Sequence, residues 1–424
     1  MGNKILRNKN LRQIILFNLC LTVLYFIVLL NLKTGIDYFI MFSTPDSKDY
    51  LSVGNWIFES IPTDQTINNP VLYPIILKSL MSLFGVPGVW FVQFLFWLGS
   101  VNFLFYTIKR ITDKRFAYIG SAVFAVNLSF IALTLHALAD VTVTFLIGMM
   151  INYMTKRLCD FKSPGFFYVV LLFFSLLSII KPVFFPVLLF LLLVIFPLFY
   201  FKSFIKSRRK YLLILVLLPV LFQISIMLYK HNTFSISEKG TSTFKLFFYA
   251  QCYADLNNIA IEDAMNIVKK DPAGPHLNFF IENKYLVAKN FFNNIVFENI
   301  TGKATFLDFP PGYRSKIFYY VMELENRFFL ILHLIFLAPC LYVLFRLWKL
   351  RSPVLGFYCF LLFLFYYLVL VTGIAFWQGD RYTVSFQPLW IVLYLFVIFS
   401  LYFHSRSSPG PEKKEINTGK NISR

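Results

Sequence analysis

Residues 14–32 read IILFNLCLTVLYFIVLLNL and follow a short basic segment that contains Lys4, Arg7, Lys9 and Arg12. A membrane-spanning helix needs about 17 to 25 predominantly apolar residues, so this run is long enough to cross a bilayer. A signal peptide also places basic residues before an apolar core, but that core is shorter and a small-residue cleavage site follows it. No such site follows Leu32. We therefore expect residues 14–32 to be a retained first span.

The composition of the whole chain indicates the same class of protein. Of its 424 residues, 58% are hydrophobic and 20% are aromatic, which exceeds the apolar share of an ordinary soluble domain. The formal net charge of +19 would suit a nucleic-acid binder only if the basic residues gathered on one soluble face. They lie between apolar runs instead. The charge therefore indicates orientation in a membrane and no nucleic-acid partner.

Apolar runs recur along the chain and predict an all-α polytopic membrane protein with about ten transmembrane helices. If the N-terminus is cytoplasmic, most Lys and Arg residues fall in loops on the cytoplasmic side, as the positive-inside rule expects. The C-terminus then lies there too, and the predicted location is a bacterial inner membrane. The runs are residues 14–32, 88–108, 116–135, 141–154, 166–180, 183–201, 211–229, 328–345, 354–376 and 384–403.

Two segments on the outer side are long enough to carry function. The first, residues 33–87, belongs to a catalytic module of residues 1–229, and its apolar stretch around Lys78 predicts interfacial helices. The second, residues 230–325, has equal numbers of acidic and basic residues. Its helical patterns and turn signals predict a small extracytoplasmic insert between spans seven and eight. The remaining predicted units are C-terminal transmembrane helices at 326–403 and a disordered cytoplasmic tail at 404–424.

Asp46 follows the first span within Thr44-Pro45-Asp46-Ser47 and would lie near the outer membrane surface. A carboxylate there can take the proton of an acceptor hydroxyl or amine while that group attacks a sugar carbon. The alternative is structural, because Asp46 or Ser47 can also cap the start of a helix. The local sequence leaves both interpretations open.

Three charged residues, Asp140, Lys181 and Arg381, interrupt apolar runs at turns on the outer side. Ionisable groups at membrane depth usually face a protein interior or an aqueous cavity and are candidates for function. Two cations beside an acid would suit a phosphate leaving group. Alternatively, these side chains extend to the membrane surface, cap helix ends or pair with a neighbour, as Asp380 could with Arg381.

Several short motifs follow one another in a characteristic order, namely Pro45-Asp46-Ser47-x-x-Tyr50, Asn69-Pro70-x-x-Tyr73-Pro74, Lys181-Pro182 and Gly379-Asp380-Arg381-Tyr382. This order resembles the GT-C superfamily of polyprenyl-phosphate-sugar-dependent glycosyltransferases. The nearest resemblance is to bacterial proteins like protein O-mannosyltransferase and lipid A aminoarabinose transferase. The chain departs from the family at Ser47, where a second acid is common, and at Asp140, where the family commonly has Glu after Ser.

The resemblance implies a GT-C-like fold and an inverting transfer of a hexosyl or pentosyl unit. The donor would be a polyprenyl-phosphate sugar in the lipid bilayer, and the acceptor an extracytoplasmic glycan, lipid or protein. Asp46 would be the catalytic base, Asp140 the second catalytic acid, and Lys181 and Arg381 would hold the donor phosphate. No cofactor is certain, and a divalent cation remains an option. The other substrate-binding residues would be Asp49, Tyr50, Tyr73 and Tyr382.

A transporter or flippase of lipid-linked sugars is the alternative function. Such proteins usually carry ionisable groups near the middle of the membrane and show repeated halves, whereas the charges here lie at outer helix ends and no repeat is evident. A non-catalytic membrane scaffold is a third interpretation. The chain contains neither the HExxH zinc pattern nor a Walker phosphate loop.

Overall fold

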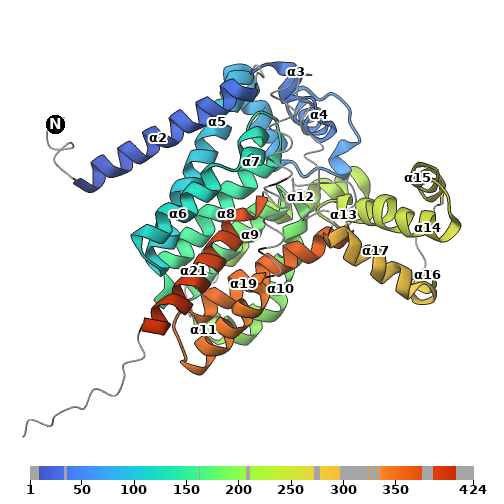
Figure 1. The fold of residues 1–424 in the computed structure, drawn as a ribbon. Helices are drawn as coiled ribbons and strands as arrows, with labels where there is room; N and C mark the ends of the chain where they lie inside the picture. The colour runs from blue at the N-terminus through green and yellow to red at the C-terminus, as the bar shows by residue number, and fades with distance from the viewer. Residues whose placement is uncertain are drawn as a thin grey trace, which may run out of the picture.

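The computed structural model describes residues 9–32, 36–161, 163–206, 211–271, 277–296, 324, 332, 335–374 and 385–406, and most of these residues are in helices. No β-strand occurs among these residues. Figure 1 shows a bundle of long helices, with a smaller group of helices between residues 239 and 296 projecting on its right. The predicted all-α class is confirmed.

The first helix, α2 (Lys9–Leu32), contains the predicted first span. It leads to α4 (Pro45–Glu59), where Thr44 is the N-cap and accepts a hydrogen bond from the Ser47 backbone N–H at 3.2 Å. Pro45 takes the first helical position, at which a missing N–H costs nothing. Helix α4 packs against α5 (Leu72–Ile111). The short elements on either side of α4 are α3 (Tyr38–Met41) and η1 (Gln65–Ile67).

One sharp kink divides α5. Gly85 has φ 65° and ψ −165°, a backbone region that is essentially restricted to glycine. The part before Gly85 contains the stretch predicted to be an interfacial helix, where Lys78 pairs with Glu59 of α4 at 2.5 Å. The part after it contains the predicted second span. The structure thus contains both expected helices, separated by the kink at Gly85.

The predicted run 116–135 is not a single helix. Helix α6 (Lys114–Ala125) ends before Asn127, whose side-chain oxygen accepts a hydrogen bond from the Phe130 N–H at 2.6 Å and caps the short α7 (Leu128–Leu133). Such a side-chain bond offers the backbone an alternative to continuing the helical ladder. Helix α8 (Ala139–Lys156) follows and packs against α5.

The predicted break at Lys181–Pro182 is present. Helix α9 (Pro164–Ser178) ends just before it, and proline cannot continue the helix because it has no N–H to donate. Helix α12 (Leu212–His231) returns beside α9. The chain between them is η3 (Pro182–Phe184), α10 (Phe185–Phe190), η4 (Leu191–Tyr200) and α11 (Phe201–Lys206).

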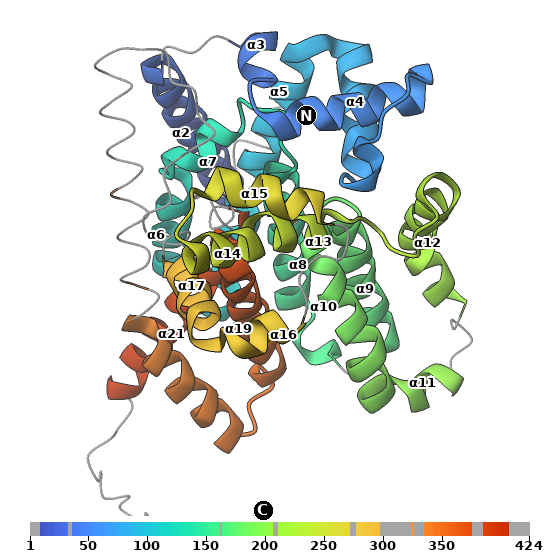
Figure 2. The same cartoon turned by 90° about the vertical axis from the view of Figure 1, so that its right-hand side faces the viewer.

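The described residues 239–271 and 277–296 of the insert are folded into helices. Its helices α15 and α17 lie where the sequence shows helical patterns. Tyr249, Ala254, Ala264 and Val268 form a small apolar core that is separate from the core of the bundle. Figure 2 shows these helices lying in front of the bundle, below α4. They are α13 (Lys239–Thr243), η5 (Phe244–Tyr249), α14 (Ala250–Asn257), α15 (Ile261–Lys270), α16 (Leu277–Glu282) and α17 (Lys284–Val296).

The insert is tied to the C-terminal part of the bundle. There α19 (Leu355–Val371) continues into the turn η7 (Thr372–Ile374), and α21 (Gln387–Arg406) packs against α19, α5, α6 and α8. The Asn294 side chain donates a hydrogen bond to the Gly373 carbonyl at 3.2 Å. The Phe291 ring lies so close to Gly373 that a β-carbon at this position would meet it at 2.5 Å.

Five helices among the described residues are long and apolar enough to cross a membrane, so the chain is an all-α membrane protein. The predicted run 328–345 lies partly outside the described residues, and the count of ten spans stays a prediction. Two shorter apolar helices are Pro164–Ser178 and Gln387–Tyr402. The five long segments are Arg12–Leu30, Leu72–Ile111, Pro182–Tyr200, Leu212–His231 and Leu355–Ile374.

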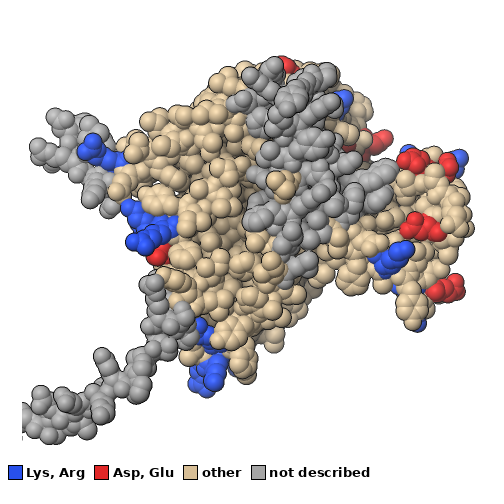
Figure 3. Space-filling view, in the orientation of Figure 1, with Lys and Arg blue, Asp and Glu red and all other residues tan. Residues whose placement is uncertain are grey.

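On one face of the molecule, charged side chains lie mainly toward the edges of the described surface. On the face drawn in Figure 3, Lys and Arg gather at the left and lower ends of the bundle, and most Asp and Glu lie on the insert at the right. Most of the described surface between these ends is neither acidic nor basic. This distribution fits a bilayer, because a charge in the hydrocarbon core is costly.

Candidate functional site

A cavity of about 290 Å³ lies where α4, the bend at Lys181, the start of the insert and the turn η7 meet. Parts of the chain far apart in sequence therefore contribute to one site. One portion of the wall is polar and another is apolar. The polar lining residues are Asp46, Tyr50, Asn68, Asn69, Lys181, Ser237, Lys239, Thr241, Thr243 and Thr372.

Asp46 is held in the first turn of α4 and lines the cavity. The N-cap of this helix is Thr44, so the interpretation of Asp46 or Ser47 as the cap is wrong. Oδ1 of Asp46 lies 3.1 Å from Nζ of Lys239, at the start of α13. A carboxylate in a helical first turn is also stabilised by the positive end of the helix dipole. Asp46 therefore presents its carboxyl group to the cavity beside an ammonium group.

Lys239 brings the insert to the cavity. Its Nζ lies 3.5 Å from Oδ1 of Asn69 as well as near Asp46. The preceding residues are fixed to the segment after η1, because Ser237 donates its hydroxyl proton to the Asn68 carbonyl at 2.7 Å and the Glu238 N–H donates to the Ile67 carbonyl at 2.8 Å. The insert therefore supplies a cation to the site, and the hydrogen bonds of Ser237 and Glu238 fix the segment that carries it.

Lys181 enters the cavity from the bend after α9 and pairs with Asp140 behind it. Nζ of Lys181 lies 2.6 Å from Oδ1 of Asp140, which also accepts a hydrogen bond from the Ser385 hydroxyl at 2.8 Å. The Asp140 side chain is 0% exposed, whereas that of Lys181 is 13% exposed. Asp140 does not line the cavity. Its geometry is that of a group that positions Lys181.

The two predicted tyrosines of this region form one aromatic pair. The rings of Tyr50 and Tyr73 meet edge to face with centroids 4.9 Å apart, and both side chains are buried. Tyr50 reaches the cavity wall, whereas Tyr73 packs behind it. Such ring pairs stabilise beyond the area that they bury, so Tyr73 supports Tyr50.

Asp49 lies one turn after Asp46 on α4 and is half-buried. Burial raises the pKa of its carboxyl group. The nearby negative charge of Asp46 raises this pKa further, and Lys239 lowers it. Asp49 is not among the lining residues of the cavity, so the structure places it beside the predicted base and not opposite it.

The predicted phosphate ligand Arg381 and the predicted substrate residue Tyr382 lie outside the described residues. Of the other predicted site residues, the structure brings Asp46, Tyr50 and Lys181 to the wall of one cavity. It places Asp140 and Tyr73 directly behind Lys181 and Tyr50, respectively.

The apolar part of the cavity lies around the bend that follows Lys181. The hydroxyl of Tyr367 on α19 donates a hydrogen bond to the Val183 carbonyl at 2.7 Å and so joins the two sides of this wall. The cavity is thus amphipathic, with charged groups beside hydrocarbon. Its apolar lining residues are Ile180, Pro182, Val183, Phe185, Pro186, Ile236, Tyr367, Val371 and Ile374.

Sequence reasoning did not find Lys239 or Ser385. Lys239 is one of many charged residues in a neutral loop, and nothing in its neighbours marks it. Ser385 is a single hydroxyl at the edge of an apolar run. Only the fold brings these residues to Asp46 and Asp140.

No group of three or more His, Cys, Asp or Glu side chains in the described part of the chain is arranged to hold a metal ion. Comparisons with protein-family models, curated proteins and solved structures found no match. The resemblance to the GT-C superfamily therefore stays a prediction.

Proposed function

We propose that this protein is an integral membrane glycosyltransferase of the GT-C type. It transfers a sugar from a polyprenyl-phosphate donor to an extracytoplasmic acceptor. The observation that supports this proposal is the convergence of Asp46 and Lys181 on one cavity with an apolar wall. Such a reaction needs a carboxylate as base, ammonium groups for the donor phosphate and an apolar surface for the prenyl chain.

The two ends of the donor match the two parts of the cavity wall. Lys181 and Lys239 supply ammonium groups for the phosphate, which forms strong charge-assisted hydrogen bonds with such donors. The surface around Val183, Phe185 and Val371 suits the first isoprene units. The cavity of about 290 Å³ approaches the lower limit of ordinary ligand sites, so most of the prenyl chain lies in the bilayer.

In the proposed reaction, Asp46 removes the proton of an acceptor hydroxyl. The acceptor oxygen then forms a bond to the anomeric carbon as the bond from that carbon to the phosphate oxygen breaks. The electron pair of the broken bond leaves with polyprenyl phosphate, whose charge Lys181 and Lys239 neutralise. Binding of the phosphate to Lys239 also draws this ammonium group from Asp46, which increases the basicity of the carboxylate.

The reaction also implies an orientation. We propose that the cavity opens on the outer side of a bacterial inner membrane, that both termini are cytoplasmic, and that about ten spans cross the bilayer. A fluorescent reporter that folds only in the cytoplasm, fused after Arg424, tests this orientation. A silent fusion that is nevertheless synthesised would contradict it.

Reconstitution in liposomes tests the function. The purified chain receives a radiolabelled polyprenyl-phosphate sugar and a mixture of membrane acceptors, and both product and movement across the bilayer are measured. We expect product with the wild-type chain and a loss of at least about 100-fold in Asp46→Asn, the usual contribution of a general base. The matched control Glu59→Gln removes another carboxylate of α4, which lies outside the cavity.

The outcomes separate the candidate functions. Movement of donor without product would make the protein a flippase, and neither product nor movement would make it a scaffold. Full activity of Asp46→Asn would reject the role of Asp46 as base.

A further inference from the structure

A second cavity lies between the other ends of the bundle helices. It has a volume of about 240 Å³ and is bounded by α2, α5 and α6. Lys109 lies near the C-terminal end of α5, whereas the Asp46 cavity adjoins the region before its N-terminal end. The two cavities therefore lie at opposite ends of the membrane helices. The second is lined by Gln13, Ile14, Phe17, Asn102, Phe105, Tyr106, Lys109, Lys114 and Tyr118.

The charge of this cavity is entirely positive. Lys109 and Lys114 line it, and none of the described lining residues is acidic. Asp113, the neighbouring acid, accepts hydrogen bonds from the backbone N–H groups of Arg115 and Phe116 as the N-cap of α6. Two ammonium groups that share a cavity repel each other, and a bound anion relieves this repulsion.

The polar groups of the cavity are held in place. Lys114 donates a hydrogen bond to Oε1 of Gln13 at 2.7 Å. Deeper along the same helices, Asn18 and Asn102 exchange side-chain hydrogen bonds at 3.2 and 2.7 Å and join α2 to α5. Side-chain hydrogen bonds of this kind hold neighbouring membrane helices together. The cavity is thus part of the described architecture of the bundle.

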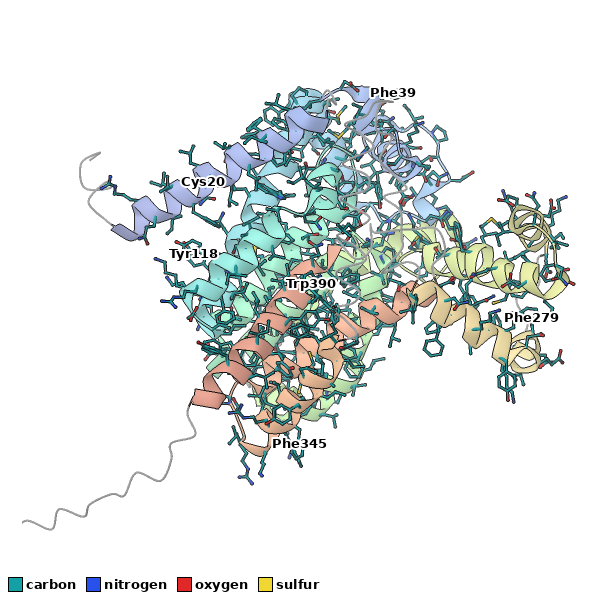
Figure 4. All side chains as sticks on the ribbon, viewed as in Figure 1. Cys20, Phe39, Tyr118, Phe279, Phe345 and Trp390 are labelled. Atoms are coloured by element: carbon teal, nitrogen blue, oxygen red, sulfur yellow. The ribbon has the colours of Figure 1, made fainter. Side chains whose placement is uncertain are left out.

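The inner wall of the cavity is aromatic. Rings of Phe17, Phe105 and Tyr118 lie in contact, with centroids 5.0 to 5.6 Å apart. Nζ of Lys114 lies 5.7 Å from the centroid of the Tyr118 ring. Figure 4 shows Tyr118 on α6, on the side that faces α2. Hydrocarbon therefore adjoins the two cations.

One side of the cavity is formed by a helix that also exposes apolar side chains. Gln13 and Ile14 lie at the start of the candidate span Arg12–Leu30. The next turns of the same helix expose Ile15, Leu16 and Leu19, a surface that suits acyl chains. A ligand in this cavity thus meets cations at the level where phospholipid headgroups lie and apolar side chains where acyl chains begin.

We propose that this cavity binds the headgroup phosphate of an anionic phospholipid in the leaflet at this end of the bundle. Basic pockets between transmembrane helices are suited to anionic headgroups because each cation attracts the surface phosphate. The volume of about 240 Å³ is below that of ordinary drug-sized sites and suits a headgroup. This inference does not depend on the proposed transfer reaction.

Thermal unfolding of the purified full chain in detergent tests the proposal. Dioctanoyl phosphatidylglycerol, dioctanoyl phosphatidylcholine and inorganic phosphate are titrated separately, since a ligand that binds the folded state raises the unfolding temperature. We expect a saturable increase with phosphatidylglycerol only. In Lys109→Gln/Lys114→Gln the apparent Kd should rise roughly 30-fold, from the ordinary contribution of two lysines.

The matched control is Lys269→Gln/Lys270→Gln, which removes the same charge from α15 of the insert. Its response should equal that of the wild type. Equal stabilisation by phosphatidylcholine, or an unchanged Kd in Lys109→Gln/Lys114→Gln, would overturn the proposal. The same increase with inorganic phosphate alone would show a free-anion site and would also overturn it. If the double variant does not fold, Gln13→Ala replaces it with the same readout, since Gln13 holds Lys114.

Discussion

Nζ of Lys181 lies 2.6 Å from Oδ1 of Asp140, and this carboxylate is fully buried in the first turn of α8. The ammonium group thus faces the cavity with its counter-ion behind it. Taking two charges out of water is costly unless each is well paired. The pair therefore makes it feasible to keep a cation at the edge of an apolar wall, where a phosphate can reach it.

Removing either member of this pair leaves a buried charge without its partner. We expect Asp140→Asn and Lys181→Met each to lower the free energy of unfolding by about 3 kcal/mol or more. The double variant should lose less than the sum of the two, by at least about 1 kcal/mol, because the residues are coupled. Denaturation in detergent measures this cycle. Strictly additive losses would show that the two residues are independent.

Lys239 tests the contribution of the insert to the site. Its ion pair with Asp46 is partly exposed, with side chains 32% and 21% exposed, so Lys239→Met should change stability by less than about 1 kcal/mol. Loss of a charge-assisted bond to phosphate should weaken donor binding about tenfold or more. Lys245→Met is the control, since Lys245 bonds the Asp271 carbonyl within the insert. Equal affinity of the two variants for the donor would show that Lys239 does not bind the donor phosphate.

We expect Asp49 to make the free energy of unfolding depend on pH in the acid range. Because burial and Asp46 raise the pKa of its carboxyl in the folded state, the folded protein binds this proton more tightly than the unfolded chain. The stability contributed by Asp49 is thus complete below its ordinary pKa of 3.8. It is lost as pH rises through the raised value.

Asp49→Asn should flatten this part of the curve of unfolding temperature against pH. The variant Glu59→Gln, which removes one negative charge from the same helix, should keep the slope. Identical curves for Asp49→Asn and the wild type would contradict the assignment.

The kink at Gly85 should tolerate no β-carbon. At φ 65° and ψ −165°, any other residue is strained by about 1–3 kcal/mol, so Gly85→Ala should lower the free energy of unfolding by that amount. Gly165→Ala serves as control, because a β-carbon there meets nothing within 4 Å. A loss in Gly85→Ala no larger than in this control would show that α5 is not kinked at Gly85.

Much of the fold follows from the length of apolar runs, because a hydrocarbon layer selects for length and hydropathy. The helix after Arg12 and the break at Pro182 were predicted on these grounds. The division of residues 116–135 was not, since Asn127 is a single polar residue in an apolar run and its capping bond depends on local geometry. By contrast, the two helices of α5 on either side of Gly85 were both predicted.

Some residues of the candidate site could be predicted from the sequence and others could not. Lys181 could be singled out because it interrupts an apolar run, where a charge is costly, and Asp46 because it follows the first span near the outer membrane surface. Their common cavity could not be derived, because it depends on how α4 and the bend after α9 pack. Lys239 carries no such mark, since a lysine in a polar loop costs nothing.

The hydrogen bond from Asn294 to the Gly373 carbonyl fixes one end of the described insert to the bundle. Thr372 and Ile374, on either side of Gly373, belong to the wall of the Asp46 cavity. Lys239, at the opposite end of the insert, belongs to that wall as well. The described insert therefore contributes to this wall from both of its ends, so a ligand that displaces α17 is expected to shift Thr372 and Ile374 as well.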